Sequence, residues 1–65
     1  MAKTKVGKWV QEQRSILGWT RRELSQRSGY TEQHIRNIET GESNPSSRCL
    51  ISLEASFHLK FEREQ

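Results

Sequence analysis

The stretch GYTEQHIRNIETG, residues 29–41, has the form of a short helix bounded by two glycines. The hydroxyl of Thr31 can cap its first turn, and Tyr30 before the cap has the staple spacing to Ile35 after it. These signals predict a helix over residues 32–40. The stretch also carries charged and amide side chains, so both fold and function depend on how this helix faces its neighbours.

The helix over residues 32–40 has a polar side that turns away from its apolar side. With Ile35 placed inward and about 100° per residue, the outward positions are Gln33, Arg36, Asn37 and Thr40. A solvated helix surface explains such a side as readily as a binding surface does. The rest of the chain must decide between the two interpretations.

Residues 5–17 are predicted to form the first helix. Its apolar residues recur at helical spacing: Val6, Trp9, Val10 and Leu17. Thr4 precedes this segment as a cap, and Gly18 follows it as a stop signal. We expect the apolar residues to face the remaining helices.

The second predicted helix begins within the segment WTRREL. Thr20 can cap it, and Glu23 three residues later can complete a capping box, which predicts a helix over residues 21–28. The link to the helix over residues 32–40 is then very short. Gly29 stands where this link needs a residue with positive φ.

The last predicted helix covers residues 47–57 and begins within PSSRCL. Ser46 can cap it, and Asn44 with Pro45 at the first helical position is a competing cap. The tail over residues 59–65 begins with alternating apolar and polar residues, which fits either a short strand or a single helical turn.

The composition favours one small all-α domain over residues 1–65, because only 31% of the residues are hydrophobic. The single cysteine, Cys49, excludes an internal disulfide, and with His34 and His58 it gives no spacing typical of a metal site. No apolar run approaches the ~18 residues of a membrane span, and the N-terminus lacks the pattern of a signal peptide. We therefore expect a cytoplasmic protein with no metal, no cofactor and no membrane contact.

The sequence offers no catalytic residue and is not expected to belong to an enzyme with a small-molecule substrate. It contains no aspartate, no glycine-rich phosphate loop and no nucleophile beside an evident base. Charge indicates a different kind of partner. Residues 1–36 hold eight Lys or Arg against three Glu, whereas residues 37–65 hold three against five, so the basic part is the candidate face for a polyanion.

A set of residues spread over most of the chain resembles the Cro and phage-repressor type of helix-turn-helix regulators, the XRE-like family. The set is Arg14, Gly18, Thr20, Glu23, Leu24, Ser25, Gly29, Thr31, Ile35, Ile38, Glu39, Gly41, Asn44, Pro45, Ser46 and Leu50. The resemblance implies a lambda-repressor-like fold of four to five short helices. It also implies that the helix over residues 32–40 enters the DNA major groove while the preceding helix lies across the backbone.

The resemblance further implies two kinds of DNA contact. The base-contacting residues would be Glu32, Gln33, Arg36 and Asn37. The phosphate-contacting residues would be Thr20, Arg21, Arg22, Asn44 and Ser46. Arg21 is also expected to pair with Glu32 and so to fix the rotamer that Glu32 presents.

Two features of the resemblance concern stability and assembly. Arg14 and Glu39 match family positions that pair with each other inside the fold, so a structural ion pair is expected between them. The tail over residues 59–65 is shorter than the fifth helix of many members of the family. We expect this tail to contribute to a homodimer.

The leading hypothesis is a sequence-specific, double-stranded-DNA-binding transcription regulator, a repressor-type protein of a phage, plasmid or other mobile element. It would bind an inverted-repeat operator as a homodimer. The alternative is a protein-interaction module, such as an antitoxin or antirepressor, built on the same fold. A tail that stays disordered until a partner binds would favour the alternative.

Overall fold

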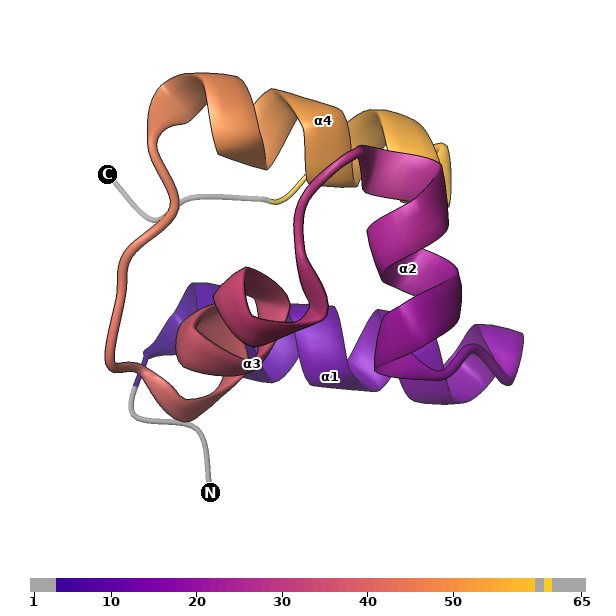
Figure 1. Cartoon of the computed structure of the whole chain (residues 1–65), viewed down its shortest axis with the longest axis horizontal. Coiled ribbons are helices and arrows are strands. Elements are labelled where there is room, and N and C mark those ends of the chain that lie inside the picture. The colour runs from indigo at the N-terminus through magenta and orange to yellow at the C-terminus, as the bar shows by residue number, and fades with distance from the viewer. Residues whose placement is uncertain (1–3, 60, 62–65) are drawn as a thin grey trace.

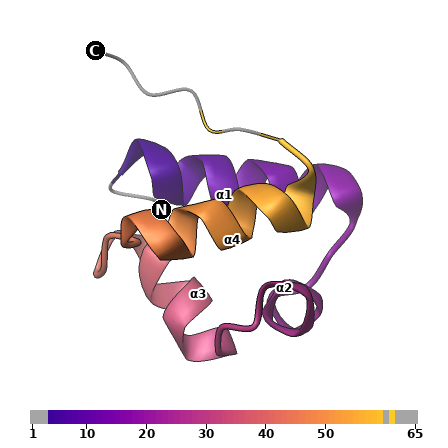
Figure 2. The same cartoon turned by 90° about the horizontal axis from the view of Figure 1, so that it is seen from above.

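The computed structural model describes residues 4–59 and 61, and these residues form four helices and no strand (Figure 1). The helices are α1 (Lys5–Leu17), α2 (Arg21–Ser28), α3 (Glu32–Thr40) and α4 (Ser47–Phe57). Helices α2 and α3 lie together on one side of α1 and α4 (Figure 2). The closest packed pairs are α1 with α3, α2 with α3, and α2 with α4. The predicted all-α class is confirmed, and the helices begin and end where their local signals place them.

Each helix begins at a side-chain hydroxyl that accepts a hydrogen bond from the backbone N–H three residues later. The four caps are Thr4, Thr20, Thr31 and Ser46. Ser46 rather than Asn44 therefore caps α4, and its Oγ accepts from the N–H of Cys49 at 3.2 Å. The expected capping box is not formed within the described residues: the Glu23 carboxylate accepts a hydrogen bond from Arg27 Nε at 2.8 Å and none from the N–H of Thr20.

The turn between α2 and α3 depends on Gly29. This residue has φ +83°, in the left-handed region that favours glycine. Its N–H donates to the carbonyl oxygen of Ser25 at 3.0 Å. The Ser25 hydroxyl donates to the carbonyl oxygen of Tyr30, which ties α2 to the start of α3. The sequence-based expectation for Gly29 is confirmed.

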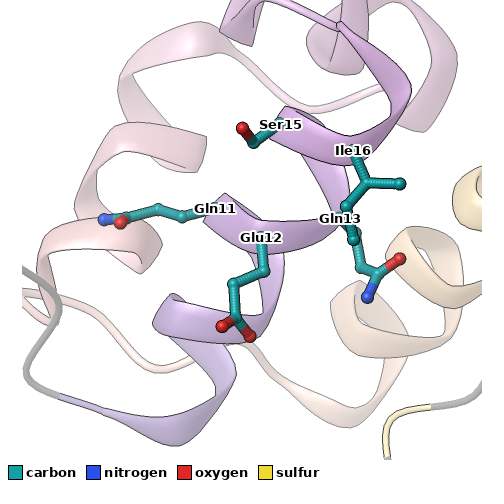
Figure 3. Close-up of a pocket in the computed structure, with 5 residues that line it drawn as sticks. All are labelled: Gln11, Glu12, Gln13, Ser15 and Ile16. Atoms are coloured by element: carbon teal, nitrogen blue, oxygen red, sulfur yellow. The ribbon is translucent and has the colours of Figure 1, made fainter.

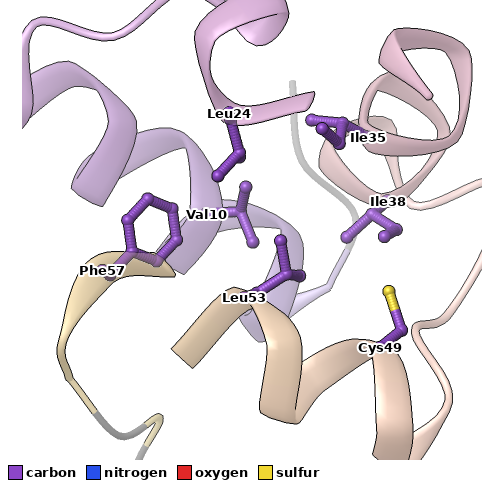
Figure 4. Close-up of a cluster of buried hydrophobic side chains, with 7 residues drawn as sticks. All are labelled: Val10, Leu24, Ile35, Ile38, Cys49, Leu53 and Phe57. Atoms are coloured by element: carbon purple, nitrogen blue, oxygen red, sulfur yellow. The ribbon is translucent and has the colours of Figure 1, made fainter. Parts of the chain in front are cut away.

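All four helices contribute to one hydrophobic core (Figure 4). The buried side chains are Val10, Leu24, Ile35, Ile38, Cys49, Leu53 and Phe57. The expectation that Leu17 belongs to this core is wrong, because its side chain is 43% exposed. Leu17 stands in the last turn of α1, and Trp19 beyond the turn packs against the core instead.

Helices α1 and α3 approach so closely that only glycine fits at one position of α1. Gly7 is buried, and a Cβ at this position would lie 2.5 Å from the carbonyl oxygen of Ile38. The carbonyl oxygen of Glu39 would be only 3.1 Å away. Both neighbours are backbone atoms of α3, so a side chain here would have to push the two helices apart.

An aromatic cluster joins α1, and the turn that follows it, to the C-terminal end of α4. Phe57 meets the edge of Trp9 with ring centroids 5.3 Å apart and stacks on Trp19 at 5.7 Å. The guanidinium carbon of Arg27 lies over the Trp19 ring, 4.3 Å from its centroid. Phe61 continues the cluster with its ring 5.2 Å from Trp9. These contacts pack Trp9 of α1 against Phe57 at the C-terminal end of α4.

The predicted strand or helical turn over residues 59–65 lies mostly outside the described residues. Leu59 and Phe61 are described, and neither belongs to a helix or a strand. The N–H of Phe61 donates to Glu54 Oε2 at 2.7 Å. Among the helices of the described segment, none is long and apolar enough to cross a membrane.

Candidate nucleic-acid interface

Helix α3 is divided sharply into a buried side and an exposed side. Ile35, Ile38 and Glu39 are fully buried. Glu32, Gln33 and Arg36 are exposed, and Asn37 is half-buried between the two sides. This division follows from the helical repeat, because residues three and four apart share a face while the remaining positions point elsewhere.

The exposed side chains of α3 differ in how strongly they are held. Gln33 Nε2 donates a hydrogen bond to Asn37 Oδ1 at 3.0 Å. Within residues 4–59 and Phe61, the side chains of Glu32 and Arg36 make no hydrogen bond or ion pair. Two ionic groups of opposite sign are therefore available to an external partner on one helix.

Glu39 is the buried anchor of the site. Its carboxylate is fully buried and accepts from Arg14 Nε at 2.7 Å and from Arg14 Nη2 at 3.1 Å. Arg14 also donates through Nη1 to the carbonyl oxygen of Trp19 at 2.9 Å. Gln11 Nε2 donates to the backbone oxygen of Glu39 at 3.0 Å. The ion pair expected between Arg14 and Glu39 is present, and it ties α3 to α1.

The expected pair between Arg21 and Glu32 is wrong, because Arg21 binds Glu39 instead. Arg21 Nε donates to Glu39 Oε1 at 3.0 Å. A buried carboxylate must be compensated by charge and hydrogen bonds, whereas an exposed pair contributes little. Glu32 lies on the exposed side of α3, where water solvates its carboxylate, so it requires no arginine partner. Sequence reasoning assigned one arginine to Glu39 and missed the second.

The group formed by Arg14, Arg21 and Glu39 carries one more positive than negative charge. The Arg21 side chain is 37% exposed, compared with 21% for Arg14. The excess charge is therefore presented mainly at Arg21, where α2 begins. The N–H groups of the first turn of a helix also favour an anion at this place.

The residues expected to contact phosphate lie at the starts of two helices. Thr20, Arg21 and Arg22 stand at the start of α2, and Asn44 and Ser46 precede α4. All of them are exposed except Arg21, which is half-exposed. Thr20 and Ser46 are also the caps of their helices, so their hydroxyls have a structural use in the free protein.

A second polar cluster lies where α3 meets α4. Tyr30 stacks on His34 with ring centroids 5.3 Å apart, and His34 Nε2 lies 3.6 Å from Cys49 Sγ. Burial raises the pKa of the Cys49 thiol, and a hydrogen bond with Tyr30 opposes this rise. A thiol that is buried and neutral is a poor nucleophile. Within the described part of the chain, no group of three or more potential ligands could hold a metal ion.

A surface hollow of about 580 Å³ lies along the outside of α1. It is lined by Gln11, Glu12, Gln13, Ser15 and Ile16 (Figure 3). These side chains come from a single helix and point in different directions (Figure 3). They do not converge on a point where a small ligand would be held.

Comparison with known proteins places this geometry in context. A model of the helix-turn-helix family matches residues 10–62 of the chain. A search of curated proteins found no match to this chain. The crystal structure of the restriction-modification controller protein C.AhdI from Aeromonas hydrophila is similar, with a TM-score of 0.82. The two chains are 23% identical over 86% of this chain and 85% of that chain, so this similarity concerns the fold.

Proposed function

The chain belongs to the Cro and phage-repressor type of helix-turn-helix family, whose members are DNA-binding transcription regulators, and from this premise we propose that it binds an operator sequence-specifically with α3 in the major groove. The observation that carries the proposal is the exposed side of α3, where Glu32 and Arg36 have no partner in the described chain. The major groove is about 12 Å wide, which admits one helix with its side chains. A repressor-type role in a phage, plasmid or other mobile element is the use we assign to this binding.

The chemistry of the exposed side chains indicates which bases they can read. Arg36 can donate two hydrogen bonds to O6 and N7 of guanine. Glu32 can accept from N4 of cytosine, and Gln33 can bind N6 and N7 of adenine. The opposite side of α3 is fixed by the core and by Glu39. Since the helix cannot easily shift, these side chains enter the groove from a defined direction.

Phosphate contacts would set the register of α3 on the duplex. Arg21 uses Nε to bind Glu39, which leaves its two terminal amino groups for a phosphate oxygen. Arg22 at the same helix start is exposed and adds a second positive charge. Asn44 and Ser46 would contact the backbone at the start of α4. Such contacts position the protein without reading sequence.

The exposed side of α4 supports a homodimer. Ile51 is 63% exposed and Leu59 is 47% exposed, and Ala55 between them is also exposed. Ile51 and Ala55 are four residues apart on α4, so they share one exposed face of the helix and form an apolar stripe. Phe61 already packs against Trp9 of its own chain, so the stripe is a better contact than Phe61. We infer that two copies bury this stripe and place their α3 helices on the half-sites of an inverted repeat.

Replacing Ile51 by glutamate should separate the dimer without unfolding the monomer. A charge on the stripe would have to be buried without a partner, whereas in the monomer the same side chain lies in water. Sedimentation at tens of micromolar should give a dimer for wild type and a monomer for Ile51→Glu. Ile16→Glu is the matched control, because Ile16 is 75% exposed on α1 and should leave the dimer intact. A monomeric wild type would contradict the proposal.

Titration with salt tests the proposed function directly. Binding to DNA should weaken steeply as salt rises, because each phosphate contact releases counterions. Binding to the preferred site should be tighter than binding to random duplex by ~10³-fold or more. A shallow salt dependence together with no sequence preference would instead favour the alternative of a protein-interaction module, such as an antitoxin or antirepressor.

A further inference from the structure

Two carboxamide side chains lie one helical turn apart on α3 and contact each other. Gln33 Nε2 donates to Asn37 Oδ1 at 3.0 Å. The main-chain oxygen of Asn37 accepts from the hydroxyl of Thr40 at 3.2 Å and from the N–H of Ser43 at 3.1 Å. The turn that carries Asn37 is therefore held by the loop after α3. The backbone of Asn37 is thus held in place, and its side chain accepts the hydrogen bond from Gln33 at this position.

The two carboxamides differ in what they can offer to a base. A carboxamide recognises adenine when its oxygen accepts from N6 and its N–H donates to N7. The oxygen of Asn37 is turned along the helix toward Gln33, and the residue is half-buried. Gln33 is exposed and keeps both its oxygen and the second N–H of its amide. Gln33 is therefore better placed than Asn37 to present the acceptor and the donor that adenine requires, because it is more exposed and its oxygen makes no hydrogen bond within the described residues.

We propose that Asn37 is a positioning residue, which orients Gln33 for an adenine in the major groove, and that Asn37 does not itself read a base. The inference rests on the proposed function, because it requires α3 to lie in the groove. A glutamine side chain that is already held in one rotamer loses less freedom when it binds. The preference for adenine then depends on both residues, although only Gln33 contacts the base.

The test compares base preferences of variants selected on duplexes of random sequence. Gln33→Ala should abolish the adenine preference at one position, a loss of about 5- to 150-fold. Asn37→Ala should weaken the preference at the same position by about 2- to 10-fold and leave the other positions unchanged. Asn37→Asp keeps an acceptor for Gln33, so it should restore the adenine preference even if its added negative charge weakens binding to every duplex.

A modified base gives a second readout of the same contact. Replacing the adenine by 7-deazaadenine removes N7 and should weaken binding by the wild type. The same replacement should have no effect on Gln33→Ala and a reduced effect on Asn37→Ala. Circular dichroism of equal strength in all variants shows that the changes do not come from unfolding.

Three outcomes would overturn the inference. Loss of preference at a different position in Asn37→Ala would show that Asn37 reads a base of its own. An unchanged profile in Asn37→Ala, with the wild type still selective, would remove the positioning role and leave the proposed function intact. A wild type without preference for any base would overturn the proposed function and this inference together.

Discussion

Replacing Glu39 by alanine is expected to lower the free energy of unfolding by about 3 kcal/mol, with DNA affinity falling only as a consequence. The carboxylate is fully buried and accepts three hydrogen bonds from Arg14 and Arg21. Its removal leaves two guanidinium groups without their anion at the junction of three helices. Both arginines are partly exposed, so water recovers some of the loss and the lower end of the usual range applies.

Urea unfolding followed by circular dichroism measures the loss of stability, because the regular structure of the described residues is entirely helical. Glu12→Ala is the matched control, since Glu12 is an exposed glutamate within α1 and its loss should change stability by less than about 0.5 kcal/mol. A small domain has roughly 3–10 kcal/mol of stability, so Glu39→Ala should remove a large fraction of it. Full stability of Glu39→Ala combined with lost DNA binding would refute the structural role.

Replacing Arg36 by alanine should weaken binding to the preferred site by about 1–3 kcal/mol and relax the preference at one base position. Arg36 is exposed, and its side chain makes no hydrogen bond, ion pair or ring contact within the described residues. The change therefore removes a contact in the complex while the free protein keeps its fold. Competition binding against duplexes that differ at single positions measures both effects.

Arg22→Ala is the matched comparison for Arg36→Ala. Arg22 is also an exposed arginine, but it stands at the start of α2, where a phosphate contact is proposed. Its loss should weaken binding to all sequences about equally and lower the magnitude of the salt slope by about 1. If Arg36→Ala behaves in the same way, Arg36 contacts phosphate and reads no base.

The parts of the fold that were predictable from the sequence are those set by neighbouring residues. A hydroxyl cap acts over one turn, so all four helices begin where their local signals place them. Helices α1, α2 and α3 end at the glycine that follows each of them, whereas α4 ends at His58. The division of α3 into a buried and an exposed side follows from its period. The hydrogen bond between Gln33 and Asn37 was not predicted, although their spacing of four residues is a signal that could have indicated it.

The features that sequence reasoning missed depend on distant parts of the chain. Arg21 binds Glu39 rather than Glu32 because the Glu39 carboxylate is buried. This burial arises only when α2 and α3 pack together. Gly7 is required because α3 crosses directly over it, and nothing in the first helix alone reveals that crossing. Leu17 has the correct period for the core but lies at the helix end.

The sharp division of α3 has a consequence for how such a protein can change over generations. Exposed residues such as Glu32, Gln33 and Arg36 contribute nothing to the core, so substitutions there leave folding almost untouched. A lineage can therefore explore new operators by mutation at these positions while Ile35, Ile38 and Glu39 stay constant. Evolution of specificity is separated from evolution of stability within a single helix of nine residues.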